Sequence, residues 1–297
     1  MPLAKSICTT THILTHYICG KQHINLEETI IMDAQLINTI YRLESTNWFE
    51  DIFQKYLDWF SGIRTEFINN FITDDRYMYF LNGLVVTLLI TLGSLILGIV
   101  LGVVVAIIRS THDKIIDEIN SKPLRTILKL LNSISNIYLT IIRGTPVVVQ
   151  LLIAYYVIFI SLTNGTIVAI LAFGINSGAY VAEIIRSGIM SIDNGQFEAG
   201  RSLGFNYIQT MLYIVMPQAL KNVLPALANE FIVLLKETSV AGYVGLQDLT
   251  KAGNTVRGIT FSAFMPLFAV ALIYLVLVIF FNNQVSKLER RLRNSER

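Results

Sequence analysis

The chain has 297 residues, of which 53% are hydrophobic and only 15% are charged. Its mean hydropathy is strongly positive, at +0.57. This composition excludes an ordinary soluble domain and indicates an integral membrane protein. The formal net charge of +2 is too small to indicate a nucleic-acid partner, and the basic residues cluster beside apolar segments as membrane topology requires.

Residues 1–47 are interpreted as a poorly defined N-terminal extension. No long apolar stretch followed by small residues marks a signal peptide in residues 1–31. Both cysteines and three of the four histidines lie there, so zinc binding is formally possible, but the usual ligand pairing is missing and we expect no metal site. We interpret residues 1–31 as a disordered extension, or as an untranslated segment if Met32 is the true start. The five side chains concerned are Cys8, His12, His16, Cys19 and His23.

Residues 48–75 are predicted to contain an amphipathic helix. Apolar side chains recur there at steps of three and four from Trp48 to Ile63, with charged residues between them. Because a spanning segment follows, we expect this helix to lie in the membrane interface with its aromatic face toward lipid. A small soluble helical hairpin is the alternative.

Residues 76–286 are predicted to form a transmembrane domain of five helices. No charge occurs between Arg76 and Arg109, which leaves ample length for a tilted span. The basic loop after Arg109 and the basic tail 287–297 are expected in the cytoplasm, whereas the short uncharged loop 161–165 is expected outside. An inside C-terminus with five spans requires an outside N-terminus. The spans cover about residues 79–108, 137–160, 166–185, 223–238 and 261–281.

The first span carries a stripe of small side chains. Its members recur at four-and-three spacing, so one face of the helix can approach another helix closely and form hydrogen bonds across the contact. Packing alone explains such a stripe. The members are Thr87, Thr91, Ser94, Gly98 and Gly102.

The second span opens with a proline. Thr145 can act as the helix cap there, and Pro146 suits a first helical position.

The segment 193–221 is polar and punctuated by glycine between two apolar regions. Residues 198–203 predict a short helix, Gly204 frees the backbone for a sharp turn, and residues 207–215 predict a second helix that Pro217 limits. We therefore expect a helix, a turn and a helix that lie outside the bilayer. An ordinary amphipathic loop between two membrane helices is the alternative.

The spacing in this segment resembles the EAA loop of ATP-binding-cassette (ABC) importer permeases. Gly200 replaces the usual second alanine and Met216 replaces the usual leucine, and both changes are small. In that family the loop docks in a cleft of the cytoplasmic ATPase, so the resemblance implies a role in coupling and not in substrate contact. The implied coupling residues are Glu198, Ala199, Gly200, Gly204, Ile214 and Pro217.

Three further segments, residues 143–150, 178–186 and 229–239, resemble the polar amino acid subfamily of these permeases. The resemblance implies an all-α membrane protein of the type I importer permease fold, with five transmembrane helices and a cytoplasmic coupling helix, in a bacterial cell membrane. It also implies a second permease subunit, identical or paralogous, two ATPase subunits and an extracellular substrate-binding protein. Five spans cannot easily surround a pathway, which supports a dimer independently.

The sequence argues against catalysis by this chain. It lacks a phosphate-binding G-x-x-x-x-G-K-[ST] loop, so ATP and Mg²⁺ would be held by the partner ATPase and no cofactor is expected here. The only histidine after position 23 is His112, in the basic loop, which leaves an intramembrane protease without a base. A secondary transporter or channel for a small polar solute is the alternative, but its usual internal repeat is absent.

Glu230 is a carboxylate inside a predicted membrane helix, where insertion costs roughly 2.5 to 3.5 kcal/mol. The residues one turn away on its own helix are apolar, whereas Glu183 has Arg186 one turn away. Glu230 must therefore face a polar pathway, pair with another helix or stay protonated. We place four residues in the substrate pathway, namely Glu183, Asn229, Glu230 and Lys236. Which amino acid is carried does not follow from the sequence.

Overall fold

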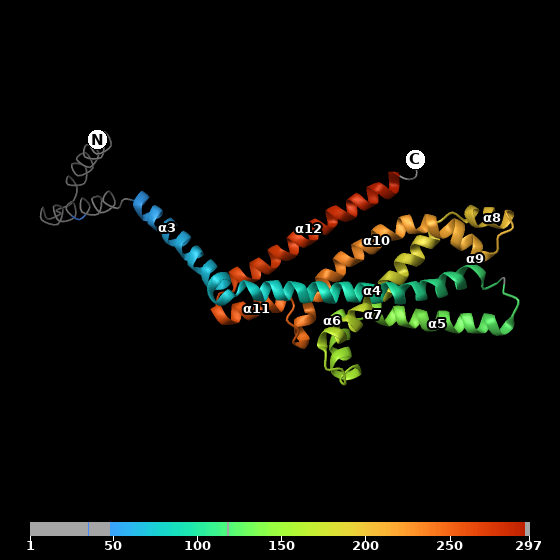
Figure 1. The fold of residues 1–297 in the computed structure, drawn as a ribbon, viewed down its shortest axis with the longest axis horizontal. Helices are drawn as coiled ribbons and strands as arrows, with labels where there is room; N and C mark the ends of the chain where they lie inside the picture. Colours follow the sequence, from blue (N-terminus) through green and yellow to red (C-terminus); the bar gives the residue numbers. More distant parts are fainter. Residues whose placement is uncertain (1–34, 36–47, 118, 295–297) are drawn as a thin grey trace, which may run out of the picture. The chain divides into compact units, whose positions relative to one another are not determined.

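The computed structural model describes residue 35, residues 48–117 and residues 119–294, and every regular element within these ranges is helical (Figure 1). The chain divides into two units, Met1–Thr65 and Glu66–Arg297. The five cysteine and histidine residues discussed for zinc, and Met32, lie outside the described residues. Among the residues that are described, no group of three or more His, Cys, Asp or Glu side chains could hold a metal ion.

Helix α3 spans Trp48–Phe67 and contains the apolar residues at steps of three and four. Ile52, Phe53 and Trp59 are exposed, and the rings of Tyr56 and Trp59 lie 6.1 Å apart. A π-helical turn, η1 (Ile68–Ile72), and a 3-10 turn, η2 (Thr73–Asp75), follow in the chain. The expected place of α3 at a membrane interface stays a prediction.

Four helical segments in the described part of the chain are long and apolar enough to cross a membrane, and a bent pair makes a fifth candidate. The all-α fold class with up to five spans is therefore confirmed. The unbroken candidates are α4 (Tyr77–Ile115), α7 (Gly165–Met190), the segment Tyr207–Val244, and α12 (Phe264–Asn294) over Phe264–Leu292; the bent pair is α5 (Lys122–Gly144) with α6 (Val147–Ile153) and the π-helical turn η3 (Ala154–Ile158).

The second expected span is not a single helix, because the chain bends by 109° between α5 and α6. Thr145 is extended, as a residue before proline prefers, and Pro146 is the N-cap of α6 and not its first helical residue. Thr145 does not cap α6 either, since its hydroxyl donates to the carbonyl oxygen of Ile141 at 2.9 Å. Gln150 stabilises the bend by donating from Nε2 to the carbonyl oxygen of Ile142 at 2.7 Å.

Pro217 does not end the helix that starts at Tyr207. Helix α9 (Tyr207–Thr210) continues through a π-helical turn, η4 (Met211–Val215), into α10 (Met216–Glu237). Pro217 lies in the first turn of α10, where a missing backbone N–H costs little, so the helical segment continues past it.

The connection after α10 packs against α4. It consists of the 3-10 segment η5 (Thr238–Val244) and helix α11 (Leu249–Thr260). Asp248 is fully buried and caps α11 by accepting from the backbone N–H groups of Thr250 and Lys251. Burial raises the pKa of the Asp248 carboxyl, and these hydrogen bonds oppose the rise. The N–H of Leu249 donates to Thr87 Oγ1 at 3.0 Å, which ties α11 to α4.

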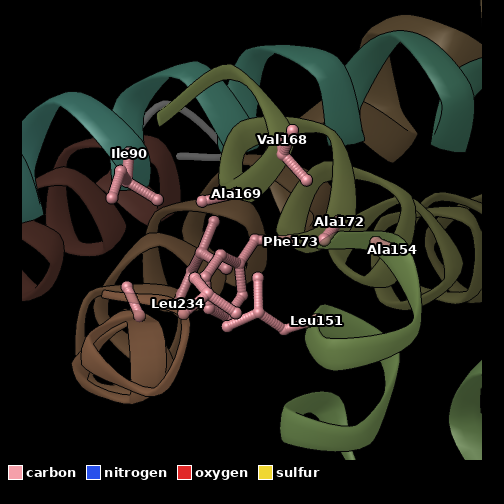
Figure 2. Packing of buried hydrophobic residues seen from close by; sticks show 10 residues of the cluster. Ile90, Leu151, Ala154, Val168, Ala169, Ala172, Phe173 and Leu234 are labelled. Carbon is pink, nitrogen blue, oxygen red and sulfur yellow. The ribbon is translucent and has the colours of Figure 1, made fainter. Parts of the chain in front are cut away.

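The main core gathers around Phe173 of α7. Figure 2 shows this cluster, in which Ile90 from α4, Leu151 from α6 and Leu234 from α10 pack with Phe173. All four side chains are fully buried. The core therefore fixes the bent α5–α6 pair and α10 against α7.

All five residues of the small-residue stripe are buried, and Ser94, Gly98 and Gly102 make the contact between α4 and α7. Thr87 and Thr91 instead bond to Leu249 and Thr238. A Cβ atom added at Gly98 would come within 3.0 Å of Ser177, and one added at Gly102 would come within 2.5 Å of Val181 Cγ1 and 2.9 Å of the backbone nitrogen of Ala182. Ser94 donates across the contact to the carbonyl oxygen of Ile170 at 3.3 Å. Glycine is therefore required because two backbones approach closely.

Gly102→Ala is expected to destabilise the protein by about 1–3 kcal/mol, because the new methyl group overlaps α7 backbone atoms that cannot move independently. The measurement is the melting temperature of the purified protein in detergent, which should fall by several degrees. Gly258→Ala is the control, since nothing lies within 4 Å of a Cβ at that helical position. Equal melting temperatures for the two variants would contradict the packing argument.

Candidate functional site

The segment with the EAA spacing folds as two short helices joined by a turn. Helix α8 spans Asn194–Ser202, and its N-cap Asp193 accepts from the N–H of Gly195 at 2.6 Å. Asn206 and Gln209 form a reciprocal capping box at the start of α9, with both hydrogen bonds at 2.9 Å. Each helix therefore begins with its own cap, which explains why so short a segment is ordered.

Two glycines shape the turn for different reasons. Gly204 has φ +82°, a left-handed conformation, and nothing lies within 4 Å of a Cβ placed there, so its requirement is purely conformational. Gly200 is buried, and a Cβ there would come within 2.6 Å of Thr210 Oγ1. The N–H of Phe205 donates to the carbonyl oxygen of Gly200 at 3.0 Å and closes the turn. Gly200 thus lets α8 and α9 touch.

The other residues of the EAA spacing lie at or near the surface. Glu198, Ala199 and Pro217 are exposed, and Ile214 is half-buried. Two large apolar side chains in the same segment, Leu203 and Ile208, are 71% and 66% exposed. Sequence reasoning passed over these two, although apolar residues beside the turn glycine are a readable signal of a contact surface.

The α8–α9 segment is bonded to the membrane helices on either side. Lys114 of α4 lies 4.4 Å from the ring centroid of Phe197 and donates to Asn194 Oδ1 at 2.8 Å. On the other side, Gln218 of α10 donates to Gln196 Oε1 at 3.1 Å. The segment is therefore fixed to α4 and α10 by its own side chains.

A polar pocket of about 500 Å³ lies between α5, α7 and α10. Of the four residues expected in the substrate pathway, Glu183 and Glu230 line this pocket. Asn229 and Lys236 are exposed and are not among its lining residues. The lining residues are Arg143, Tyr180, Glu183, Ile184, Ser187, Gly188, Ser191, Asn222, Ala226 and Glu230.

Glu230 is only 7% exposed, and its partner comes from another helix. Ser177 of α7 donates its hydroxyl to Glu230 Oε1 at 2.9 Å. No local sequence pattern points to this partner, because the two residues are 53 positions apart. Among the described residues, Glu230 makes no ion pair, and its carboxyl group bonds to the Ser177 hydroxyl and lines the pocket.

Glu183 lies near three arginine side chains. Its carboxylate is 2.6 Å from Arg109 of α4, 3.4 Å from Arg186 on its own helix and 3.9 Å from Arg143 of α5. Arg186, the expected partner, is thus one of three, and the shortest contact is with Arg109. Arg186 also lies 3.4 Å from Asp113, which extends the charged cluster along α4.

Arg143 was not expected in the site, although it opens one of the segments that resemble the polar amino acid subfamily. Its guanidinium lies 5.7 Å from the ring centroid of Tyr180, and both residues line the pocket. Gln150 Oε1 accepts from Asn176 at 2.9 Å and links α6 to α7. The pocket thus presents one cation, one aromatic ring and two carboxylates, a set suited to a small zwitterionic solute. These groups belong to Arg143, Tyr180, Glu183 and Glu230.

Residues 125–294 match the family described as binding-protein-dependent transport system inner membrane component. A putative glutamine transport system permease protein GlnP of Rickettsia typhi is 33% identical over 220 residues, covering 73% of this chain and 94% of that protein. The arginine transport system permease protein ArtQ of Bacillus subtilis is 38% identical over 166 residues, covering 55% of this chain and 76% of that protein.

Solved structures of ABC transporters are also similar to this chain. A crystal structure of an amino acid ABC transporter with histidines has a TM-score of 0.64 and 37% identity, and covers 74% of this chain and 98% of that chain. The MetNI methionine ABC transporter, in inward-facing conformations, has a TM-score of 0.62 at 19% identity, which shows the fold alone. The chain therefore belongs to the family of binding-protein-dependent transport system inner membrane components, the permease subunits of ABC importers.

Proposed function

We propose that this permease carries a polar amino acid of the glutamine or arginine class through the pocket that contains Arg143, Glu183 and Glu230. The chain is a non-catalytic membrane subunit of an ATP-driven importer, and the family match favours this function over a secondary transporter or channel. Relatives named for glutamine and arginine transport support the substrate class. The observation that carries the proposal is the buried carboxylate of Glu230, which lines this pocket and makes no ion pair among the described residues.

An amino acid offers a carboxylate and an ammonium group that match the two ends of this pocket. Arg143 is half-exposed at one wall and can pair with the substrate carboxylate. Among the described residues, the Ser177 hydroxyl is the one hydrogen-bond partner of Glu230, whose carboxylate can also accept from the ammonium group. Glu183 is already compensated by arginines, so we assign it to holding the cations in place and not to the ammonium group.

Membership of this family implies an ATPase and a binding protein as partners. We assign the ATPase contact to α8 and the turn, through exposed Glu198 and Ala199 and the apolar Leu203 and Ile208. ATP and Mg²⁺ are held by that separate chain. A second permease subunit, identical or paralogous, completes the pathway. The complex lies in the bacterial cell membrane with the C-terminus of this chain in the cytoplasm.

Topology is tested by single cysteines in a background with Cys8→Ser and Cys19→Ser. Lys122→Cys, in the basic region at the start of α5, should resist an impermeant thiol reagent in intact cells. Thr163→Cys, exposed in the loop before α7, should react. Permeabilised cells are the control, because both positions should then be labelled. Labelling of Lys122→Cys in intact cells would overturn the topology.

Coupling through the turn is tested at Gly204, where a side chain in the left-handed region costs about 1–2 kcal/mol. Gly204→Ala should reduce uptake and the amount of ATPase that copurifies. Gly204→Asn should be less impaired, because asparagine tolerates this conformation. Membrane levels of permease are the control. Equal uptake for the wild type and the alanine variant would remove the assignment.

The pathway is tested with Glu230→Gln, which keeps an oxygen that accepts from Ser177 but removes the charge. The complex should assemble and keep its basal ATPase rate, while uptake falls by about tenfold or more because a charged hydrogen bond to substrate contributes about 1.5–3 kcal/mol. Asn229→Ala is a control, since this neighbour lies outside the pocket lining. Failure to assemble would make Glu230 structural, and normal uptake would exclude it from the pathway.

A further inference from the structure

An open groove of about 500 Å³ lies between α4, α10 and α12. It is on the opposite side of α10 from the pocket that contains Glu230. Leu92 and Leu95 of α4, Ala228 of α10, and Val285 and Leu288 of α12 line it. Apart from Gln284 its lining is apolar. The transport pocket described above shares none of these residues. The groove therefore has the chemistry of a site for hydrocarbon.

A pair of aromatic rings lies in the groove. Phe231 of α10 and Phe281 of α12 both line the groove, and their ring centroids lie 4.8 Å apart in an edge-to-face arrangement. From Phe281 the groove residues of α12 continue toward the C-terminal end of the helix. A chain entering from that end would therefore meet the ring pair.

The C-terminal part of α12, beside the groove, is basic. Gln284, Lys287 and Arg291 share one face of α12, since they lie at positions i, i+3 and i+7, and Lys287 and Arg291 are exposed. Across the groove, Lys221 lies seven residues before Ala228 and so on the same face of α10. Within the described residues, no ion pair is formed by Lys221, Lys287 or Arg291. The acidic Glu289 lies about 160° around α12 from Arg291.

The length of this arrangement matches half a bilayer. Arg291 lies ten residues beyond Phe281, a rise of about 15 Å along a helix. The hydrocarbon core of a membrane is about 30 Å thick, so one leaflet measures about 15 Å. A cation at Arg291 is thus at headgroup depth when the ring pair is at the midplane.

We infer that the groove binds one anionic phospholipid from the leaflet that surrounds the C-terminal end of α12. An acyl chain lies along Val285 and Leu288 toward the ring pair, and the phosphate contacts Lys287 and Arg291. Basic side chains near a membrane surface attract anionic headgroups, whereas a zwitterionic lipid would gain the acyl contact alone. This inference does not depend on which solute the permease carries.

The test uses the permease–ATPase complex in nanodiscs that contain equal amounts of dioleoylphosphatidylglycerol and dioleoylphosphatidylcholine. Native mass spectrometry of the released complex counts the phosphatidylglycerol retained per permease. Arg291→Gln should weaken retention about fivefold, and Lys287→Gln with Arg291→Gln about 30-fold, because each cation contributes about a factor of five. Arg290→Gln is the matched control, since Arg290 lies about 160° around α12 from the groove residue Leu288, and this variant should retain lipid as the wild type does.

A groove-filling variant separates the acyl contact from the charges. Val285→Phe should lower retention with every cation still present, provided that the complex elutes as the wild type does in size exclusion. Equal retention by the Arg290→Gln and Arg291→Gln variants would overturn the inference. So would a bis-maleimide cross-link between two permease chains through Leu288→Cys, in the background without Cys8 and Cys19, because a second copy would then fill the groove.

Discussion

The close contact of α4 with α7 is the constraint on which the rest of the membrane domain depends. In lipid, helices gain little from burying apolar surface, so they associate through close van der Waals contact and hydrogen bonds. Glycines at 98 and 102 let the two backbones approach, and Ser94 adds a hydrogen bond across them. Because α7 carries Ser177 and Glu183, this contact also sets where the polar groups of the pocket lie.

Electrostatics divide the pocket into two unlike ends. Near Glu183 three arginines from α4, α5 and α7 outnumber the acids Glu183 and Asp113, so this end carries excess positive charge. Glu230 is held by a hydroxyl and, among the described residues, by no cation. A zwitterion can lie along such a gradient with its carboxylate toward the arginines, whereas an uncharged solute would leave both ends without a partner.

The fold and the α8–α9 segment were largely predictable from sequence because their signals are local. Hydropathy located the spans, and the left-handed Gly204 is where a turn residue was expected between two short helices. The bend before α6 was missed although Thr145 and Pro146 were considered, because the same residues suit both a helix start and a break. The local proline rule also misjudged Pro217, which lies in a first turn and is tolerated there.

The pocket was predictable only in part, because its contacts join residues far apart in the sequence. Glu230 was identified from the cost of a buried carboxylate, but its bond to Ser177 and the bond from Arg109 to Glu183 depend on how separate helices pack. Asn229, the neighbour of Glu230, does not line the pocket, for a geometric reason. One residue along a helix is a rotation of about 100°, so a neighbour in sequence faces elsewhere.

The short α8–α9 segment is joined to both walls of the pocket by very little chain. Only three residues separate Met190, the last residue of α7, from α8, and α9 continues through η4 directly into α10. Asn222 of α10 also donates to Ser191 at 3.0 Å, which bridges the same two helices beside the pocket. A displacement of α8 would therefore act on α7 and α10 together, the two helices that carry Glu183 and Glu230.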